Sequence, residues 1–92
     1  MIRVNEYMDG QVKSLGFESA GAAFTAGVVR PGEYTFPTEK EEHLTVTVGT
    51  IRFRLPGEEW VEKNAGGKIV IPPGIEFDLR VEDTASYICE YR

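Results

Sequence analysis

Residues 66–77, GGKIVIPPGIEF, decide the fold of this chain. They hold a short apolar run, 68–71, between a pair of glycines and the turn sequence Pro72-Pro73-Gly74. Such a run predicts a β-strand bounded by two tight turns. The stretch has the spacing G-x5-P-x-G-x2-F, and an upstream spacing, E-x6-G, joins Glu42 to Gly49.

Most of the remaining chain also predicts strands. Ranges 42–48, 51–55 and 76–81 place apolar residues at every second position, and no segment keeps a helical period. Ten glycines and five prolines punctuate the sequence. We therefore predict an all-β fold of about eight or nine short strands, either a β-sandwich or a small barrel. Large inward side chains would leave room in such a barrel for only one small ligand.

Bulk properties exclude several classes of protein. Ninety-two residues, 41% of them hydrophobic and 27% charged, predict a single globular domain over 1–92. No apolar run approaches the ~20 residues that span a bilayer, and no signal peptide is evident, so we expect no membrane partner. A net charge of −5 without a basic cluster disfavours nucleic-acid binding. The single cysteine, Cys89, cannot form an internal disulfide and favours a cytoplasmic setting.

The two spacings resemble the two motifs of the cupins, which normally carry a His-x-His, a Glu and a later His as metal ligands. Glu42 falls at the Glu position, but Phe77 stands at the last His position and range 34–38 contains no histidine. The resemblance implies a single cupin-type, jelly-roll-like β-barrel that has lost its metal site. The only histidine, His43, cannot build an imidazole-rich site, so we predict no bound metal.

Over nearly its whole length the chain also resembles the small pyrimidine/purine nucleoside phosphorylase family. The specific blocks are Gly-Glu-Tyr-Thr-Phe at 32–36 and Ser-Tyr-Ile-Cys-Glu-Tyr at 86–91, with weaker matches at 5–7 and 12–17. The resemblance implies a homodimeric enzyme, a pentosyltransferase without metal or organic cofactor. Its implied reaction is phosphorolysis of many purine and pyrimidine nucleosides to free base and ribose 1-phosphate.

Phosphorolysis requires a site for phosphate, groups that hold the ribose and a surface for the base, and Glu42 is the best catalytic candidate. Its parity with Leu44 and Val46 predicts that it points inward near the barrel mouth. There its carboxylate could accept hydrogen bonds from ribose hydroxyls and stabilise positive charge on the sugar. The alternative is a solvated residue within the acidic group Glu39, Glu41 and Glu42.

Aromatic residues are the candidates for binding the nucleoside. Tyr34 and Phe36 are predicted to line the pocket wall, because an aromatic face can stack on any base. Tyr87 or Tyr91 could offer a hydroxyl to the base or phosphate, although core packing suits at least one of them. Phe77 is predicted to be core.

Lys13 is the candidate phosphate ligand. It is the one charged residue on a strand face that it shares with Leu15 and Phe17, and its ammonium group could reach phosphate as a compact point charge. It could equally extend from a strand end into water. Arg52 and Arg54 alternate with Ile51 and Phe53, so we expect them to point outward.

Two other functions remain open on the sequence. A non-catalytic cupin that binds a sugar, nucleoside or anion would need the same pocket without turnover. A metal-dependent dioxygenase or isomerase would need ligands that the chain lacks. Cys89 has no basic neighbour in sequence to activate it, so we expect it to be a small buried residue.

Overall fold

The computed structural model describes all 92 residues and contains ten strands and no helix, hence no helix long and apolar enough to cross a membrane. In chain order the strands are β1 (Arg3–Tyr7), β2 (Val12–Ser19), β3 (Ala22–Val29), β4 (Gly32–Pro37), β5 (Glu42–Val48), β6 (Thr50–Arg54), β7 (Val61–Asn64), β8 (Lys68–Ile71), β9 (Glu76–Val81) and β10 (Ala85–Tyr91). The predicted all-β class is confirmed. The strand missed by the sequence is β1, whose side chains are almost all exposed and therefore show no apolar alternation.

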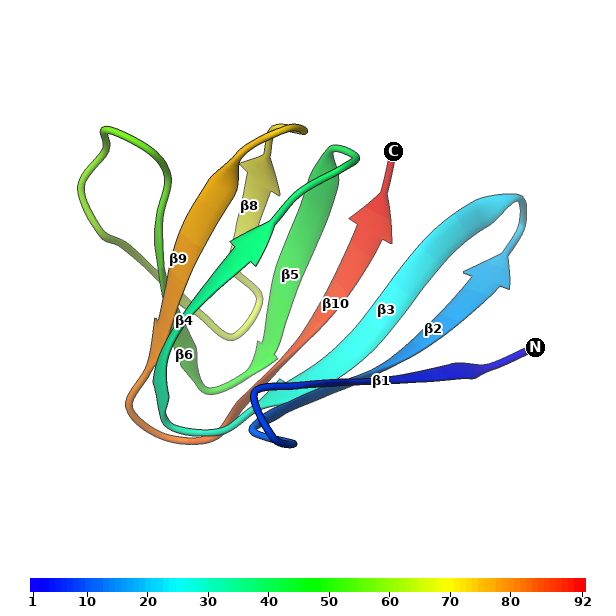
Figure 1. Ribbon diagram of the computed structural model, residues 1–92, viewed down its shortest axis with the longest axis horizontal. Helices are drawn as coiled ribbons and strands as arrows, with labels where there is room; N and C mark the ends of the chain where they lie inside the picture. The colour runs from blue at the N-terminus through cyan, green and yellow to red at the C-terminus, as the bar shows by residue number, and fades with distance from the viewer.

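The strands form two antiparallel sheets that face each other. One has six strands in the order β1-β2-β3-β10-β5-β8, and the other has four in the order β4-β9-β6-β7. In Figure 1 the smaller sheet lies toward the left, while β2 and β3 extend to the right beyond it. The two sheets are separate and do not close into the continuous barrel that the cupin resemblance implied.

The hydrophobic core fills the space between the sheets. Inward residues of β5, β6 and β9, such as Val46, Phe53 and Leu79, are almost fully buried, as their alternation predicted. Burial of each such side chain stabilises the fold by about 1.5–3 kcal/mol. The core comprises Val12, Val29, Tyr34, Leu44, Val46, Ile51, Phe53, Ile71, Phe77, Leu79, Val81, Ala85 and Cys89.

Strand β2 has the opposite phase to the one predicted. Val12 and Ser14 point inward and are buried, whereas Lys13 and Leu15 are exposed on the outer face. Register explains the difference, because Ser14 pairs with Gly27 of β3, and Gly27 pairs with Tyr87 of β10. Small residues occupy the inner face here because the large ring of Tyr87 lies over it.

The contact between Gly27 and Tyr87 shows how closely this region is packed. A Cβ atom at Gly27 would lie only 2.4 Å from Cζ of the Tyr87 ring. No side chain larger than hydrogen therefore fits at position 27 while Tyr87 keeps its place. Tyr87 in turn reaches the space between the sheets where the candidate site lies.

Candidate functional site

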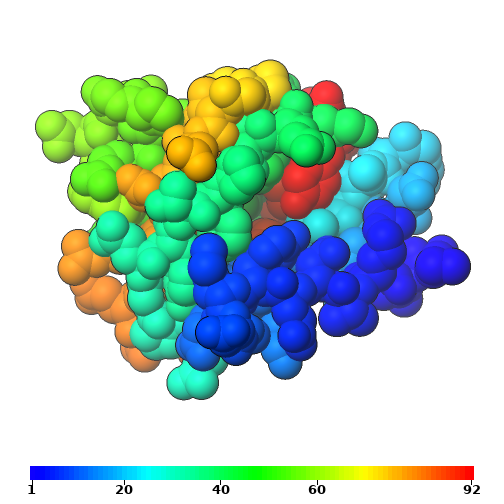
Figure 2. Space-filling view, viewed as in Figure 1, coloured from blue at the N-terminus to red at the C-terminus, as the bar shows by residue number.

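A cavity of about 440 Å³ opens between the two sheets. Figure 2 shows the hollow between the N-terminal segment in blue and the green segment that follows β4, with the C-terminal strand in red at its side. This volume lies within the range of sites that enclose small organic ligands. The lining residues are Tyr7, Val12, Ser14, Ala23, Val29, Phe36, Pro37, Glu39, Lys40, Glu42, Leu44, Phe77, Leu79, Tyr87 and Tyr91.

Glu42, the predicted catalytic residue, lines this cavity from the first position of β5. It pairs with Tyr91 of β10 on one side and with Ile71 of β8 on the other, so its side chain shares the inward face of Leu44. Burial raises the pKa of the Glu42 carboxyl, while a hydrogen bond from Cys89 lowers it. The cavity therefore holds one half-buried carboxyl group among mainly apolar walls.

Tyr87 and Tyr91 both reach the cavity from β10. Burial raises the pKa of Tyr87 to about 12 and also raises the pKa of Tyr91. Both phenols are therefore neutral at physiological pH, and each can donate or accept a hydrogen bond. The Tyr91 hydroxyl lies 3.0 Å from the Thr25 hydroxyl, which fixes the end of its ring.

Of the two aromatics on β4, only Phe36 lines the cavity. Tyr34 was predicted at the pocket wall, but it is 8% exposed and belongs to the core. Its hydroxyl donates hydrogen bonds to the carbonyls of Arg30 and Pro31, at 2.8 and 3.1 Å. The turn that precedes β4 thus holds this ring in place, and the position predicted for Tyr34 is wrong.

Phe77 has both a core position and a place at the cavity. It is 4% exposed, belongs to the hydrophobic core as predicted, and also forms part of the cavity wall. Its ring centroid lies 6.1 Å from that of Phe36 and 6.4 Å from that of Phe53. The position of the last cupin histidine is therefore filled by an apolar ring that joins the core to the pocket.

Lys13 does not line the cavity but extends into water, which is the alternative that the sequence left open for it. Because β2 has the opposite phase, its side chain is 59% exposed on the outer face, with Nζ 3.2 Å from a carboxylate oxygen of Glu6. Arg52 and Arg54 point outward as predicted and form ion pairs there, Arg54 with Asp78 at 2.7 Å.

The structure adds four polar residues to the site that the sequence did not propose for it, namely Tyr7, Ser14, Glu39 and Lys40. Tyr7, at the end of β1, packs edge-to-face on Phe36 with ring centroids 5.7 Å apart. Ser14 accepts a hydrogen bond from the Asn5 amide at 3.2 Å. Lys40 lies in the loop before β5 and is the only lysine or arginine that lines the cavity. Its place two residues before Glu42 is the one sequence signal that could have indicated it.

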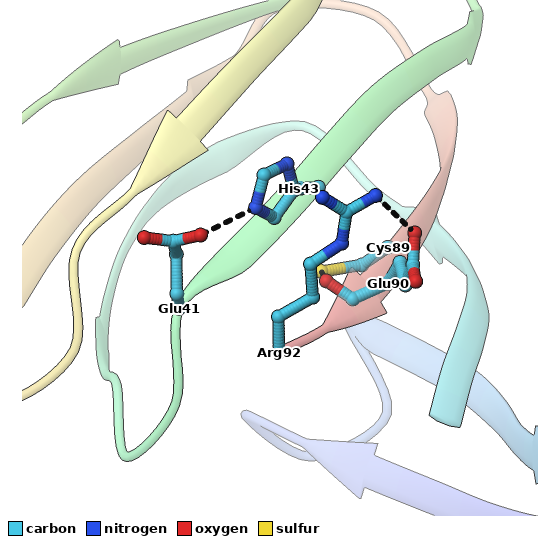
Figure 3. A network of polar contacts seen from close by, with 5 residues as sticks. All are labelled: Glu41, His43, Cys89, Glu90 and Arg92. Carbon is cyan, nitrogen blue, oxygen red and sulfur yellow. Dashed lines mark hydrogen bonds and ion pairs between the residues drawn. The ribbon is translucent and has the colours of Figure 1, made fainter. Parts of the chain in front are cut away.

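The polar network at the ends of β5 and β10 lies outside this cavity. Figure 3 shows Glu41 bonded to the ring of His43 and Arg92 bonded to Glu90. The Glu41 carboxylate lies 2.6 Å from Nε2 of His43, and the Arg92 guanidinium lies 3.0 Å from the Glu90 carboxylate. Alternation along β5 places His43 on the opposite face from Glu42, as predicted. No three His, Cys, Asp or Glu side chains come together in a way that could hold a metal ion.

The two facing antiparallel sheets define a cupin-like fold with an aromatic cavity between them. The chain belongs to the pyrimidine/purine nucleoside phosphorylase family, whose model matches residues 2–91. Relatives of that name from Photobacterium profundum and Pseudomonas putida strain W619 are 41% and 44% identical to it. The alignments cover 99% of both chains in the first case, and 100% of this chain and 99% of the relative in the second. The family resemblance seen in the sequence is thereby confirmed.

Solved structures confirm the fold. A protein of unknown function from Vibrio parahaemolyticus has a TM-score of 0.97 and 39% identity, covering 100% of this chain and 99% of its own. A putative ethanolamine utilization protein Q from Salmonella typhimurium has a TM-score of 0.80 at 16% identity, covering 96% of this chain and 76% of its own. The second likeness concerns the fold alone, and it supports the predicted cupin type.

Proposed function

We propose that the protein is a broad-specificity nucleoside phosphorylase that converts purine and pyrimidine nucleosides and phosphate to free base and ribose 1-phosphate. The observation that carries the proposal is the half-buried Glu42 carboxyl in an aromatic cavity of a chain from this family. Two relatives that are named for this activity align with the chain over 99% of their length.

The proposed reaction moves the ribosyl group from the base to phosphate. A phosphate oxygen forms a bond to the anomeric carbon as the C–N glycosidic bond breaks, and the bonding electron pair leaves with the base nitrogen. The base then takes up one proton. Positive charge develops on the ribose during this exchange, so a fixed negative group beside the sugar lowers the barrier.

Glu42 is the residue that we assign to the sugar. In its ionised form it accepts hydrogen bonds from ribose hydroxyls and stabilises the developing oxocarbenium ion through its charge. The apolar surroundings strengthen this interaction because they keep water away from the carboxylate. Since burial also raises the pKa of Glu42, we expect activity to fall at acidic pH as this group is protonated.

The aromatic residues suit a base of variable size. Phe36 and Tyr7 offer ring faces and edges on which either a purine or a pyrimidine can pack. The neutral phenols of Tyr87 and Tyr91 can act as donors or as acceptors, so they do not require one pattern of hydrogen-bonding groups on the base. This combination supports broad specificity. We propose that no metal or organic cofactor takes part.

The proposed enzyme is a homodimer in the cytoplasm. The outer face of the six-stranded sheet exposes the apolar side chains of Val4, Leu15 and Val28; Val4 pairs with Leu15, and Val28 pairs with Lys13. The Glu6–Lys13 ion pair borders this patch with both signs of charge, so an identical face of a second copy can cover it without net repulsion. We expect Leu15→Glu to give a monomer by sedimentation, and an unchanged mass would place the dimer contact elsewhere.

The direct test uses chelator-treated protein with uridine, adenosine, inosine and guanosine, each with and without phosphate. We expect free base and ribose 1-phosphate only when phosphate is present, and no gain on adding divalent metal. A metal requirement would contradict the metal-free part of the proposal. Saturable nucleoside binding without product would contradict the phosphorylase and indicate the non-catalytic binding function instead.

A further inference from the structure

We propose that Lys40 binds the phosphate co-substrate at the mouth of the cavity. This inference rests on the proposed phosphorolysis, which requires a cation close to the ribose. Lys40 is the one lysine or arginine among the residues that line the cavity. An ammonium group on a flexible stem is a common ligand for phosphate, as a compact point charge with three donors.

The other cationic side chains are placed or paired elsewhere. The nine that do not line the cavity are Arg3, Lys13, Arg30, Arg52, Arg54, Lys63, Lys68, Arg80 and Arg92. Lys13, Arg52, Arg54 and Arg92 already form ion pairs with acidic side chains. Lys40 forms none, so its ammonium is available to a ligand.

The loop that carries Lys40 is fixed on both sides. Before it, the buried Thr38 donates a hydrogen bond to the Pro72 carbonyl at 2.8 Å, and its hydroxyl accepts one from the Ile75 amide at 3.1 Å. After it, the Glu41 carbonyl accepts a hydrogen bond from the Arg92 amide at 2.8 Å. The backbone of Lys40 is therefore held at the mouth, while its exposed side chain keeps the freedom to reach a ligand.

The charges around the mouth of the cavity explain why phosphate binding would require Lys40. Two carboxyl groups, those of Glu39 and Glu42, line the same cavity. When both are ionised they repel a phosphate dianion, and Lys40 supplies the only opposing charge on the cavity wall. Glu42 and Lys40 also stand two residues apart in the chain, which places the sugar-binding and phosphate-binding groups on one short segment.

The test compares three variants in the phosphorolysis assay with phosphate as the varied substrate. We expect Lys40→Gln to raise KM for phosphate by roughly tenfold or more, since a charged hydrogen bond is lost, while KM for the nucleoside stays within about twofold. Lys40→Arg should restore most of the phosphate affinity because it keeps the charge. Lys68→Gln removes the same charge from an exposed position outside the cavity and should leave both constants unchanged.

Calorimetric titration of each protein with inorganic phosphate measures phosphate affinity without turnover. It therefore separates failure of this inference from failure of the proposed function. If the wild-type protein cleaves nucleosides and Lys40→Gln keeps its KM for phosphate, the assignment of Lys40 is overturned and the phosphorylase stands. If the wild-type protein cleaves nothing, the proposed function fails, and Lys40-dependent phosphate binding would still support the site. Equal phosphate affinity in wild type and Lys40→Gln, or no phosphate binding by either, would overturn the inference.

Discussion

The thiol of Cys89 donates a hydrogen bond to Oε1 of Glu42, with 3.6 Å between sulfur and oxygen. It is the only side-chain hydrogen bond that Glu42 makes within the chain. Burial raises the pKa of the Cys89 thiol, so the sulfur keeps its proton and remains a donor. The single cysteine therefore supports the candidate catalytic carboxylate from the core side of the cavity and is not suited to act as a nucleophile.

Replacement of Glu42 by glutamine should separate catalysis from folding. Glutamine keeps the shape of the side chain but removes the negative charge that we assign to the ribose, so we expect kcat to fall by about 100-fold or more. Stability should change little, because burial already disfavours the charged form of Glu42. Steady-state kinetics and a melting curve of the same sample check both parts. Unchanged turnover in a folded variant would remove Glu42 from the mechanism.

The hydrogen bond from Cys89 predicts a change in the pH profile. It lowers the pKa of Glu42, so Cys89→Ala should let that pKa rise further. If activity requires ionised Glu42, the acidic limb of kcat/KM then moves to higher pH, while the rate at the plateau changes less. A pH–rate profile measures the shift.

Cys89→Ser is the matched control for this experiment, because it keeps a donor at nearly the same place. Its acidic limb should lie closer to that of the wild-type protein than the limb of Cys89→Ala does. Coincident profiles for the wild-type protein and Cys89→Ala would show that the thiol does not tune Glu42.

Removal of the Phe77 ring should act mainly on stability. Its side chain is 4% exposed and contacts the core, so Phe77→Ala should lower the free energy of unfolding by about 3–5 kcal/mol. Urea denaturation of the wild-type protein and the variant gives this difference. An unaltered transition would mean that the ring faces an open pocket and contributes little to the core.

The sequence correctly predicted the buried face of those strands in which apolar and polar residues alternate. In β5, β6 and β9, the residues that are buried are the ones that alternate as large apolar side chains, such as Leu44, Phe53 and Leu79. In β2 the same rule chose the wrong face, because Tyr87 from β10 demands small inward neighbours. That demand comes from a distant strand and cannot be read within β2.

Residues of the candidate site could be predicted only where motif spacing or alternation along a strand was enough to identify them. Glu42 and Phe36 could be found in this way, and both line the cavity. Tyr7 lies on a strand with no apolar alternation, and Lys40 lies in a loop whose course depends on Thr38 and its distant partners. Their convergence on one cavity is a property of the tertiary structure, and the only local signal was the place of Lys40 two residues before Glu42.

The close contact between Gly27 and the Tyr87 ring leads to a prediction about both stability and substrate binding. A methyl group at position 27 would overlap the Tyr87 ring, with 2.4 Å between Cβ and Cζ, so Gly27→Ala must displace a ring that lines the cavity. We expect a loss of about 1–3 kcal/mol of stability from overpacking, together with a raised KM for nucleosides. Gly16→Ala is the matched control, because its Cβ would meet only the flexible end of the Arg3 side chain at 3.3 Å. Equal stability and equal KM in the two variants would show that the position of Tyr87 does not shape the pocket.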